Sequence, residues 1–256
     1  MPIPVRVLNT LIATACLLSL LSRAQAESLT ASAPERAIAA AADENKPIFV
    51  MFYKEQDPAK EAMLSVLKAN SAVKKQQAAW TTVQVTDPTQ RRVAEKFKVT
   101  RAPMPSLVAV YPNGAVTGVF PKKVTQAELS TCIVSPKTVE CLKSLQDNRL
   151  VLICVQTAPD QPLPLGVQDF QADPHFAKRT HIITVAADDP SEERFLTGME
   201  LNPATIDAPV TVFLAPPGAH VGTFAETASK GELAEGLAAA GKCCNDKNCK
   251  HNQKAK

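Results

Sequence analysis

The feature that most constrains the fold of this chain is an internal repeat with a period of about 103 residues. The apolar run 48–53 corresponds to 150–155 at an offset of 102, and the run 104–110 corresponds to 208–214 at an offset of 104. Three further matches keep the same order: Asp87-Pro88 with Asp189-Pro190, Pro112-Asn113-Gly114 with Pro216-Pro217-Gly218, and Gly118-Val119-Phe120 with Gly222-Thr223-Phe224. Ordered matches at a steady offset indicate a duplication, so we expect two copies of one unit.

The last helix of each copy is predicted from a shared start signal. Thr125 with Glu128, and Ser229 with Glu232, fit the capping box, in which a hydroxyl and a carboxylate satisfy backbone N–H groups at a helix start. Helices are also expected at the start of each copy, through Asp43 and through Leu145, because a serine and a proline open each pattern. Short apolar runs alternate with these helical patterns, which predicts an α/β fold.

Each copy is therefore predicted to run helix, strand, helix, strand, helix, strand, turn, strand, helix. The strand-helix-strand passages imply parallel pairing with right-handed crossovers, and the last two strands of each copy form a hairpin. We expect domains at 27–134 and 135–241, each a central mixed sheet flanked by helices, followed by a tail at 242–256.

The first 26 residues fit a secretory signal peptide. Arg6 precedes an apolar run over 7–21, and Ala24-Gln25-Ala26 supplies a small-x-small cleavage site. The apolar run is shorter than the roughly 20 residues that a membrane span needs, so no span is expected after cleavage. We predict an exported protein, periplasmic or secreted, with lipidation at Cys16 as the alternative to cleavage after Ala26.

Composition narrows the class of protein. Hydrophobic residues make up 45% of the 256 residues and charged residues 21%, which is typical of globular domains and excludes a collagen, a wholly disordered chain and a multi-span membrane protein. Loss of the signal would remove Arg6 and Arg23 and no acid, which lowers the net charge from +3 to +1. So small a charge gives no reason to expect a nucleic-acid partner.

The sequence resembles the thioredoxin family, as two tandem units that cover nearly all of the mature chain except the tail. The resemblance is carried by Lys46-Pro47-Ile48-Phe49-Val50-Met51-Phe52-Tyr53-Lys54-Glu55-Gln56-Asp57-Pro58-Ala59-Lys60, by the segment from Asp87 to Val99, by Met104-Pro105-Ser106-Leu107 and by Asn113-Gly114. It implies a thioredoxin-like α/β fold in which Pro105 and Pro209 are the cis-prolines before the third strand of each unit.

The chain departs from that family at the active site. Redox-active members carry Cys-x-x-Cys where the first strand passes into its helix, because the helix N-terminus lowers the pKa of a thiol. Here Gln56, Asp57, Pro58 and Ala59 stand at that junction, and the corresponding segment 157–165 of the second unit also lacks cysteine. Neither unit is expected to exchange disulfides at the usual place.

Six cysteines remain after signal cleavage, and export favours pairing over free thiols. A Cys132–Cys141 disulfide across the connection between the two units is one candidate. The tail gathers Cys243, Cys244, Cys249 and His251 among five lysines, which leaves three interpretations open: a disulfide, a metal site or a reactive thiol. Cys154 falls within a predicted strand and is expected to be a small buried hydrophobe.

The leading hypothesis is an exported, non-catalytic protein that binds a polypeptide or assembly partner, because loss of both sulfurs need not remove the peptide groove of a thioredoxin-like fold. No cofactor is expected. The alternatives place function in the tail, as a thiol-disulfide oxidoreductase with Cys154 or another cysteine resolving the intermediate, or as a metal-binding protein. Whether the chain is an enzyme stays open on the sequence, with the missing Cys-x-x-Cys as the argument against it.

Overall fold

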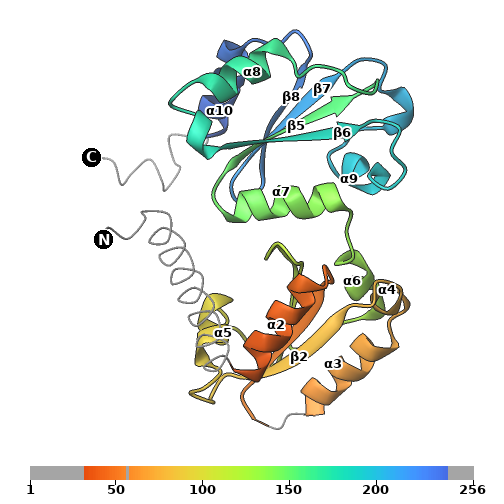
Figure 1. Cartoon of the computed structure of the whole chain (residues 1–256), viewed down its shortest axis with the longest axis vertical. Helices are drawn as coiled ribbons and strands as arrows, with labels where there is room; N and C mark the ends of the chain where they lie inside the picture. The colour runs from red at the N-terminus through yellow and green to blue at the C-terminus, as the bar shows by residue number, and fades with distance from the viewer. Residues whose placement is uncertain (1–31, 56–57, 242–256) are drawn as a thin grey trace, which may run out of the picture. The chain divides into compact units, whose positions relative to one another are not determined.

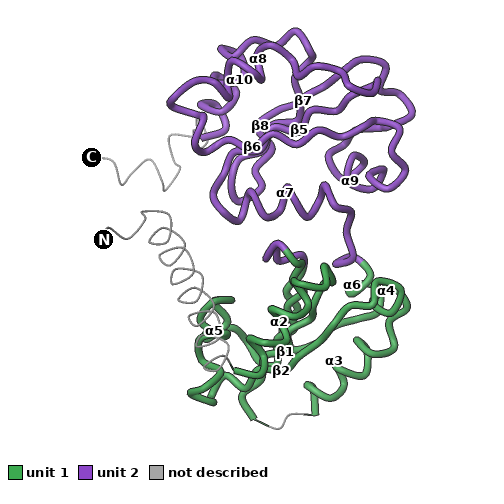
Figure 2. Tube along the Cα trace, in the orientation of Figure 1, with its two compact units in different colours: residues 1–112, 118–130 green, residues 113–117, 131–256 purple. Residues whose placement is uncertain are grey.

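The computed structural model describes residues 32–55 and 58–241. The chain folds into two compact units, shown in separate colours in Figure 2. The first unit comprises residues up to 112 together with 118–130, and the second comprises 113–117 together with the chain from 131 onward. The predicted signal peptide, the positions Gln56 and Asp57, and the tail at 242–256 lie outside the described residues.

The first unit begins with a helix and builds its sheet from four short strands (Figure 1). Its elements are α2 (Ala33–Asp43), β1 (Ile48–Tyr53), α3 (Pro58–Ala69), α4 (Ser71–Lys75), β2 (Ala79–Gln84), α5 (Arg91–Lys96), β3 (Ser106–Val110), β4 (Val116–Pro121) and α6 (Gln126–Thr131).

The second unit repeats this order. Its elements are α7 (Pro136–Gln146), β5 (Leu150–Gln156), α8 (Leu165–Ala172), the 3-10 helix η1 (Ala177–Arg179), β6 (Thr180–Ala186), α9 (Glu193–Gly198), the 3-10 helix η2 (Pro203–Thr205), β7 (Val210–Ala215), β8 (Ala219–Ala225) and α10 (Lys230–Ala240). In the part of the chain that the structure covers, no helix is both long and apolar enough to cross a membrane.

The two sheets share one topology. Their strand orders are β2-β1-β3-β4 and β6-β5-β7-β8. The first strand of each unit, β1 or β5, is an inner strand. It pairs in parallel with the strand that follows it in the chain, and antiparallel with the third strand of the unit. This arrangement, with helices before and after the paired strands, confirms the predicted fold class of two thioredoxin-like α/β units.

Strand β5 of the second unit contributes side chains to two apolar layers, one on each face of the sheet. Successive side chains of a strand point to opposite faces of the sheet. Accordingly, Val151, Ile153 and Val155 of β5 belong to the cluster that includes residues of α7 and α9, whereas Leu152 and Cys154 belong to the cluster that includes residues of α8 and α10. Figure 1 shows α8 and α10 together over the second of these faces. Both faces of the sheet are therefore covered, which explains why the sequence of β5 is a continuous apolar run.

The predicted capping boxes are present. The Glu128 carboxylate accepts hydrogen bonds from the Thr125 N–H at 2.7 Å and from its hydroxyl at 2.8 Å. The Glu232 carboxylate accepts the same pair from Ser229, at 2.8 and 2.9 Å. These bonds lower the pKa of both carboxyl groups below the ordinary value, because they stabilise the charged form.

Five helices end in the left-handed backbone region without glycine. The residues with positive φ at these ends are Asn45, Gln77, Lys98, Asn148 and Glu200. At each end, the N–H of the following residue bonds to a carbonyl five positions back, as Lys46 does to Ala41 at 2.8 Å. This pattern is the Schellman motif, which satisfies carbonyl groups that the helix leaves unpaired.

The prediction for the two prolines is half right. The Met104–Pro105 bond is cis, as expected. The prediction for Pro209 is wrong: in the described part of the second unit the cis bond is Pro216–Pro217, in the turn between β7 and β8. The trans preference of an X–Pro bond is only about 0.5–1 kcal/mol, so the local surroundings select the isomer, and alignment of the repeats does not carry it across.

Candidate functional site

The first candidate site lies where β1 passes into α3. Pro58 is the first residue of α3 and Ala59 is the second, so the proline of the thioredoxin-like junction occupies a position that suits its fixed φ and missing N–H. Gln56 and Asp57 precede it, outside the described residues. The segment from β1 to Ala59 contains no cysteine.

A lysine lies beside this junction. The Lys60 ammonium is 4.1 Å from the centre of the Tyr53 ring and 3.4 Å from the Glu61 carboxylate, and its side chain is only 15% exposed. A cation over an aromatic ring is attracted by the negative face of the ring. The start of α3 is therefore held against the end of β1 by a packed lysine stem and its charge.

The loop before β3 supplies the second part of this site. The Ser106 hydroxyl donates to the Pro103 carbonyl, and the Lys122 N–H donates to the Pro105 carbonyl at 2.6 Å. Between these two bonds, neither the N–H nor the carbonyl of Met104 has a hydrogen-bond partner among the described residues. The loop is thus fixed on both sides of one residue whose backbone N–H and carbonyl are unpaired in the described chain.

Three cationic residues are connected to Met104 by the chain or by a backbone bond: Lys98 and Arg101 precede it in the same loop, and the Lys122 N–H bonds to the next residue, Pro105. Lys98, Arg101 and Lys122 are all exposed, and none of them forms an ion pair with another described residue. Charges of one sign without partners create a local positive potential, which attracts carboxylates.

The corresponding junction in the second unit is closed by its own side chains. The Gln161 side-chain oxygen accepts the Thr157 N–H at 3.1 Å, and the Gln161 carbonyl accepts from the Gln156 side chain. Three prolines at 159, 162 and 164 restrict this segment further, and no cysteine interrupts it. This junction therefore offers no thiol, and its first residue and its side chains are tied to Gln161.

Two cysteines of the second unit, Cys141 and Cys154, are poor nucleophiles. Cys154 is buried in the core of the second unit, as expected, and burial raises the pKa of its thiol to about 11. Cys141 is also buried, and burial, with a smaller contribution from the Glu140 charge, raises its pKa to about 11. At neutral pH both are protonated, whereas the thiolate is the reactive form.

The predicted Cys132–Cys141 disulfide is wrong. Cys141 is a free thiol, and its side chain packs in the cluster with Leu145, Val151 and Ile153 beneath α7. A helix buries the side chains of one face, and the face of α7 that carries Cys141 is turned toward the sheet. The predicted tail site of Cys243, Cys244, Cys249 and His251 lies outside the described residues, and within them no cluster of metal-ligating side chains is present.

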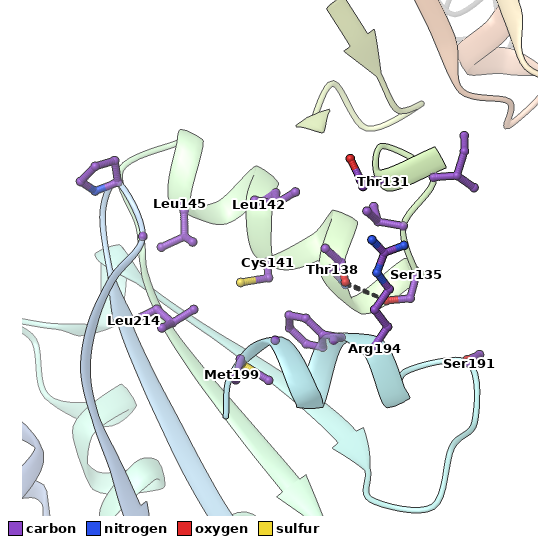
Figure 3. Close-up of a pocket in the computed structure, with 16 residues that line it drawn as sticks. Thr131, Ser135, Thr138, Cys141, Leu142, Leu145, Ser191, Arg194, Met199 and Leu214 are labelled. Carbon is purple, nitrogen blue, oxygen red and sulfur yellow. Dashed lines mark hydrogen bonds between the residues drawn. The ribbon is translucent and has the colours of Figure 1, made fainter. Parts of the chain in front are cut away.

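The second unit also contains a pocket that no sequence pattern predicts (Figure 3). It encloses about 460 Å³ between α7, α9 and the turn from β7 to β8. Its walls are mostly apolar, formed by Val134, Leu142, Leu145, Phe195, Met199 and Leu214. Its lining residues are spread from 131 to 218 in several short segments, so no local motif could have revealed it.

A buried carboxylate organises one edge of this pocket. Glu192 is 3% exposed and accepts hydrogen bonds from the Ser135 hydroxyl at 2.5 Å and from the Lys137 N–H at 3.1 Å. A negative charge is favourable at the N-terminus of a helix such as α7. The Ser135 hydroxyl also lies 2.8 Å from that of Thr138, so both hydroxyls at this edge have protein partners (Figure 3).

The chain matches no protein-family model and no curated protein. Among solved structures it is similar to a thioredoxin from Thermus thermophilus, with 21% identity, 39% of this chain and 78% of that chain covered, and a TM-score of 0.30. A disulphide isomerase from Xylella fastidiosa Temecula1 shows 16% identity, 37% and 81% coverage and a TM-score of 0.29. Human ERp44 shows 12% identity, 80% and 56% coverage and a TM-score of 0.35. The thioredoxin-like fold itself is assigned from the strand order and pairing of the two sheets.

Proposed function

We propose that this chain is an exported, redox-inactive protein that binds an extended, acidic stretch of polypeptide at the Met104 loop of its first unit. The observation that carries the proposal is the backbone of Met104, whose N–H and carbonyl are unpaired within the described chain while the bonds of Ser106 and Lys122 hold the loop around it. An extended peptide can satisfy both groups by pairing with the backbone, which is how strand addition provides affinity.

The charges around the loop select the partner. Lys98, Arg101 and Lys122 carry no opposite charge within hydrogen-bonding reach in the described part of the chain. Charge complementarity speeds association and rejects partners of the wrong sign more than it adds affinity. An acidic segment is therefore the partner that this surface favours.

The absence of dithiol chemistry is proposed on two grounds. The junction before α3 holds no cysteine, and Cys154, which the tail-based oxidoreductase hypothesis uses as a resolving thiol, is buried with its pKa raised to about 11. A thiol that is both inaccessible and protonated is a poor partner for disulfide exchange.

Amide mapping by NMR tests the binding proposal. We expect reduced, carboxymethylated α-lactalbumin, an acidic unfolded polypeptide, to shift the amide resonances of Met104 and Arg101 in the ¹⁵N-labelled mature chain. The double variant Arg101→Glu with Lys122→Glu should raise the Kd about tenfold, because like charges then face the ligand. The matched control is Lys74→Glu with Lys75→Glu, two exposed lysines of α4. Unchanged resonances in the 98–104 loop would refute the proposal.

A further inference from the structure

The pocket of the second unit is lined mainly by apolar side chains, together with a neutral thiol. Eight of its lining residues, Pro217 included, carry aliphatic, aromatic or thioether groups, and Cys141 adds a buried thiol that stays protonated at neutral pH because its pKa is about 11. Ligand pockets in proteins typically have volumes of about 300–1,000 Å³ and apolar walls with few polar groups. At about 460 Å³, this pocket has the size and lining to hold the apolar body of a small molecule.

One cationic side chain, Arg194, lines this pocket. Arg194, on α9, is the only charged side chain among the described residues that line it, and its guanidinium makes no ion pair or hydrogen bond with any of them. Figure 3 shows this side chain extending from α9 toward the connection that leads into α7. A guanidinium presents paired N–H groups that match the two oxygens of a carboxylate.

We propose that this pocket binds an amphipathic monocarboxylate, such as a medium-chain fatty carboxylate, with its hydrocarbon chain against the apolar walls and its carboxylate on Arg194. All lining residues belong to the second unit, so the site is separate from the Met104 loop of the first.

The hydrogen-bonding groups of the pocket favour a hydrocarbon over a peptide. Ser135 and Thr138 already bond to each other, and Ser135 also donates to Glu192. A polypeptide entering the apolar interior would bury amide groups without partners, which costs free energy for each unpaired group. A hydrocarbon chain has no such groups, and its single charge meets the single unpaired cation.

Calorimetric titration of the mature chain with sodium decanoate, below its micelle concentration, tests the proposal. We expect saturable binding of one molecule, with octanoate and dodecanoate giving the dependence on chain length. Decanol has the same apolar body without the charge and should bind about tenfold more weakly, because a hydrogen-bonded charge is lost. Decylamine, which places a cation against Arg194, should not bind.

Two pairs of variants locate the site. Arg194→Gln should weaken decanoate binding about tenfold and leave decanol unaffected, whereas Lys178→Gln, an exposed cation outside the pocket, should change neither. Gly198→Leu should abolish binding, because Gly198 lines the pocket and a Cβ there meets no atom within 4 Å. Its control is Gly231→Leu in α10, where a Cβ makes only an ordinary contact at 3.6 Å.

Three outcomes would overturn the proposal. Equal affinity for decanoate and decanol, or an unchanged affinity in Arg194→Gln, would show that no carboxylate is recognised. Binding that persists in Gly198→Leu, with circular dichroism showing a native fold, would place the ligand elsewhere. Displacement of decanoate by an apolar, uncharged peptide of equal or higher affinity would mean that the pocket takes a protein segment instead.

Discussion

Glu192 is the only buried side chain with a formal charge among the described residues. Its two oxygens are taken by the Ser135 hydroxyl and the Lys137 N–H, so the charge is both hydrogen-bonded and close to the N-terminus of α7. A buried charge is tolerated when its hydrogen-bonding capacity is used in this way. The residue therefore fixes the start of α7 relative to the start of α9.

We expect Glu192→Ala to lower the free energy of unfolding of the second unit by about 2–3 kcal/mol, since hydrogen bonds to charged groups are worth about 1.5–3 kcal/mol. Glu193→Ala, the exposed neighbour, should cost far less. Urea unfolding followed by far-UV circular dichroism measures both, because Trp80 and both tyrosines precede residue 113 and fluorescence does not report on the second unit. Equal losses in the two variants would contradict the assigned role of Glu192.

At the scale of elements, α8 lies in close backbone contact with the segment that leads into α10. A Cβ built on Gly166 would lie 2.0 Å from the Ala228 carbonyl oxygen and 2.8 Å from the Ser229 carbonyl carbon. Both atoms belong to the backbone, which cannot move aside as a side chain can. Glycine is required here by the approach of two elements and not by its own φ.

Gly166→Ala should therefore lower the free energy of unfolding by about 3 kcal/mol or more, at the upper end of the cost of overpacking. Gly198→Ala is the matched control, because an added methyl group meets nothing within 4 Å and alanine favours the helix. Thermal unfolding monitored by circular dichroism compares them. A Gly166→Ala protein as stable as Gly198→Ala would show that α8 can shift freely against α10.

The capping box of α10 predicts a dependence on pH. The bonds from Ser229 lower the pKa of Glu232 below 4.5 in the folded protein, so its contribution to stability is present above about pH 4.5 and is lost as the pH falls through the folded pKa. We expect Glu232→Gln to be less stable than the parent at pH 7 and equally stable near pH 2. Glu235→Gln, an exposed acid on the same helix, serves as control. A stability difference that stays constant across this pH range would rule out the carboxylate as its cause.

At the scale of the whole molecule, disulfide exchange at the start of α3 should be obtainable by substitution. Replacing Gln56 and Ala59 with cysteine places two thiols at the start of α3, a helix of 12 residues whose N-terminus favours a thiolate. We expect the double variant to reduce insulin with dithiothreitol as electron donor, at a rate well above that of the parent chain. The variant Gln56→Ser with Ala59→Ser is the control for the change in size and polarity. Parent activity equal to that of the double cysteine variant would refute the redox-inactive proposal.

The fold was predictable because its signals are local and repeated. The apolar run 48–53 is β1 to the residue, and each capping box lies where its side chains predicted it. The isomer of the bond before Pro209 and the state of Cys141 were not predictable, because both are decided by the three-dimensional surroundings and not by the sequence pattern. The pocket at Arg194 could not be predicted from the sequence for the same reason. For the unpaired backbone of Met104, the only signal in the sequence was the predicted cis-proline next to it, Pro105.

The helix ends with positive φ offer positions at which substitution by glycine can raise the stability of the protein. A side chain in that region costs about 1–2 kcal/mol, and glycine returns part of this in backbone entropy, so Gln77→Gly and Glu200→Gly should each stabilise by about 0.5–1 kcal/mol. Asn148→Gly should gain less, because asparagine tolerates this conformation. Thermal midpoints of the single variants and of the combined variant measure the effect, and a loss of stability at both Gln77 and Glu200 would contradict it. These ends are thus not at their optimum for stability, and Gln77 and Asn148 give an engineer a way to stabilise the fold at positions that belong to neither proposed binding site.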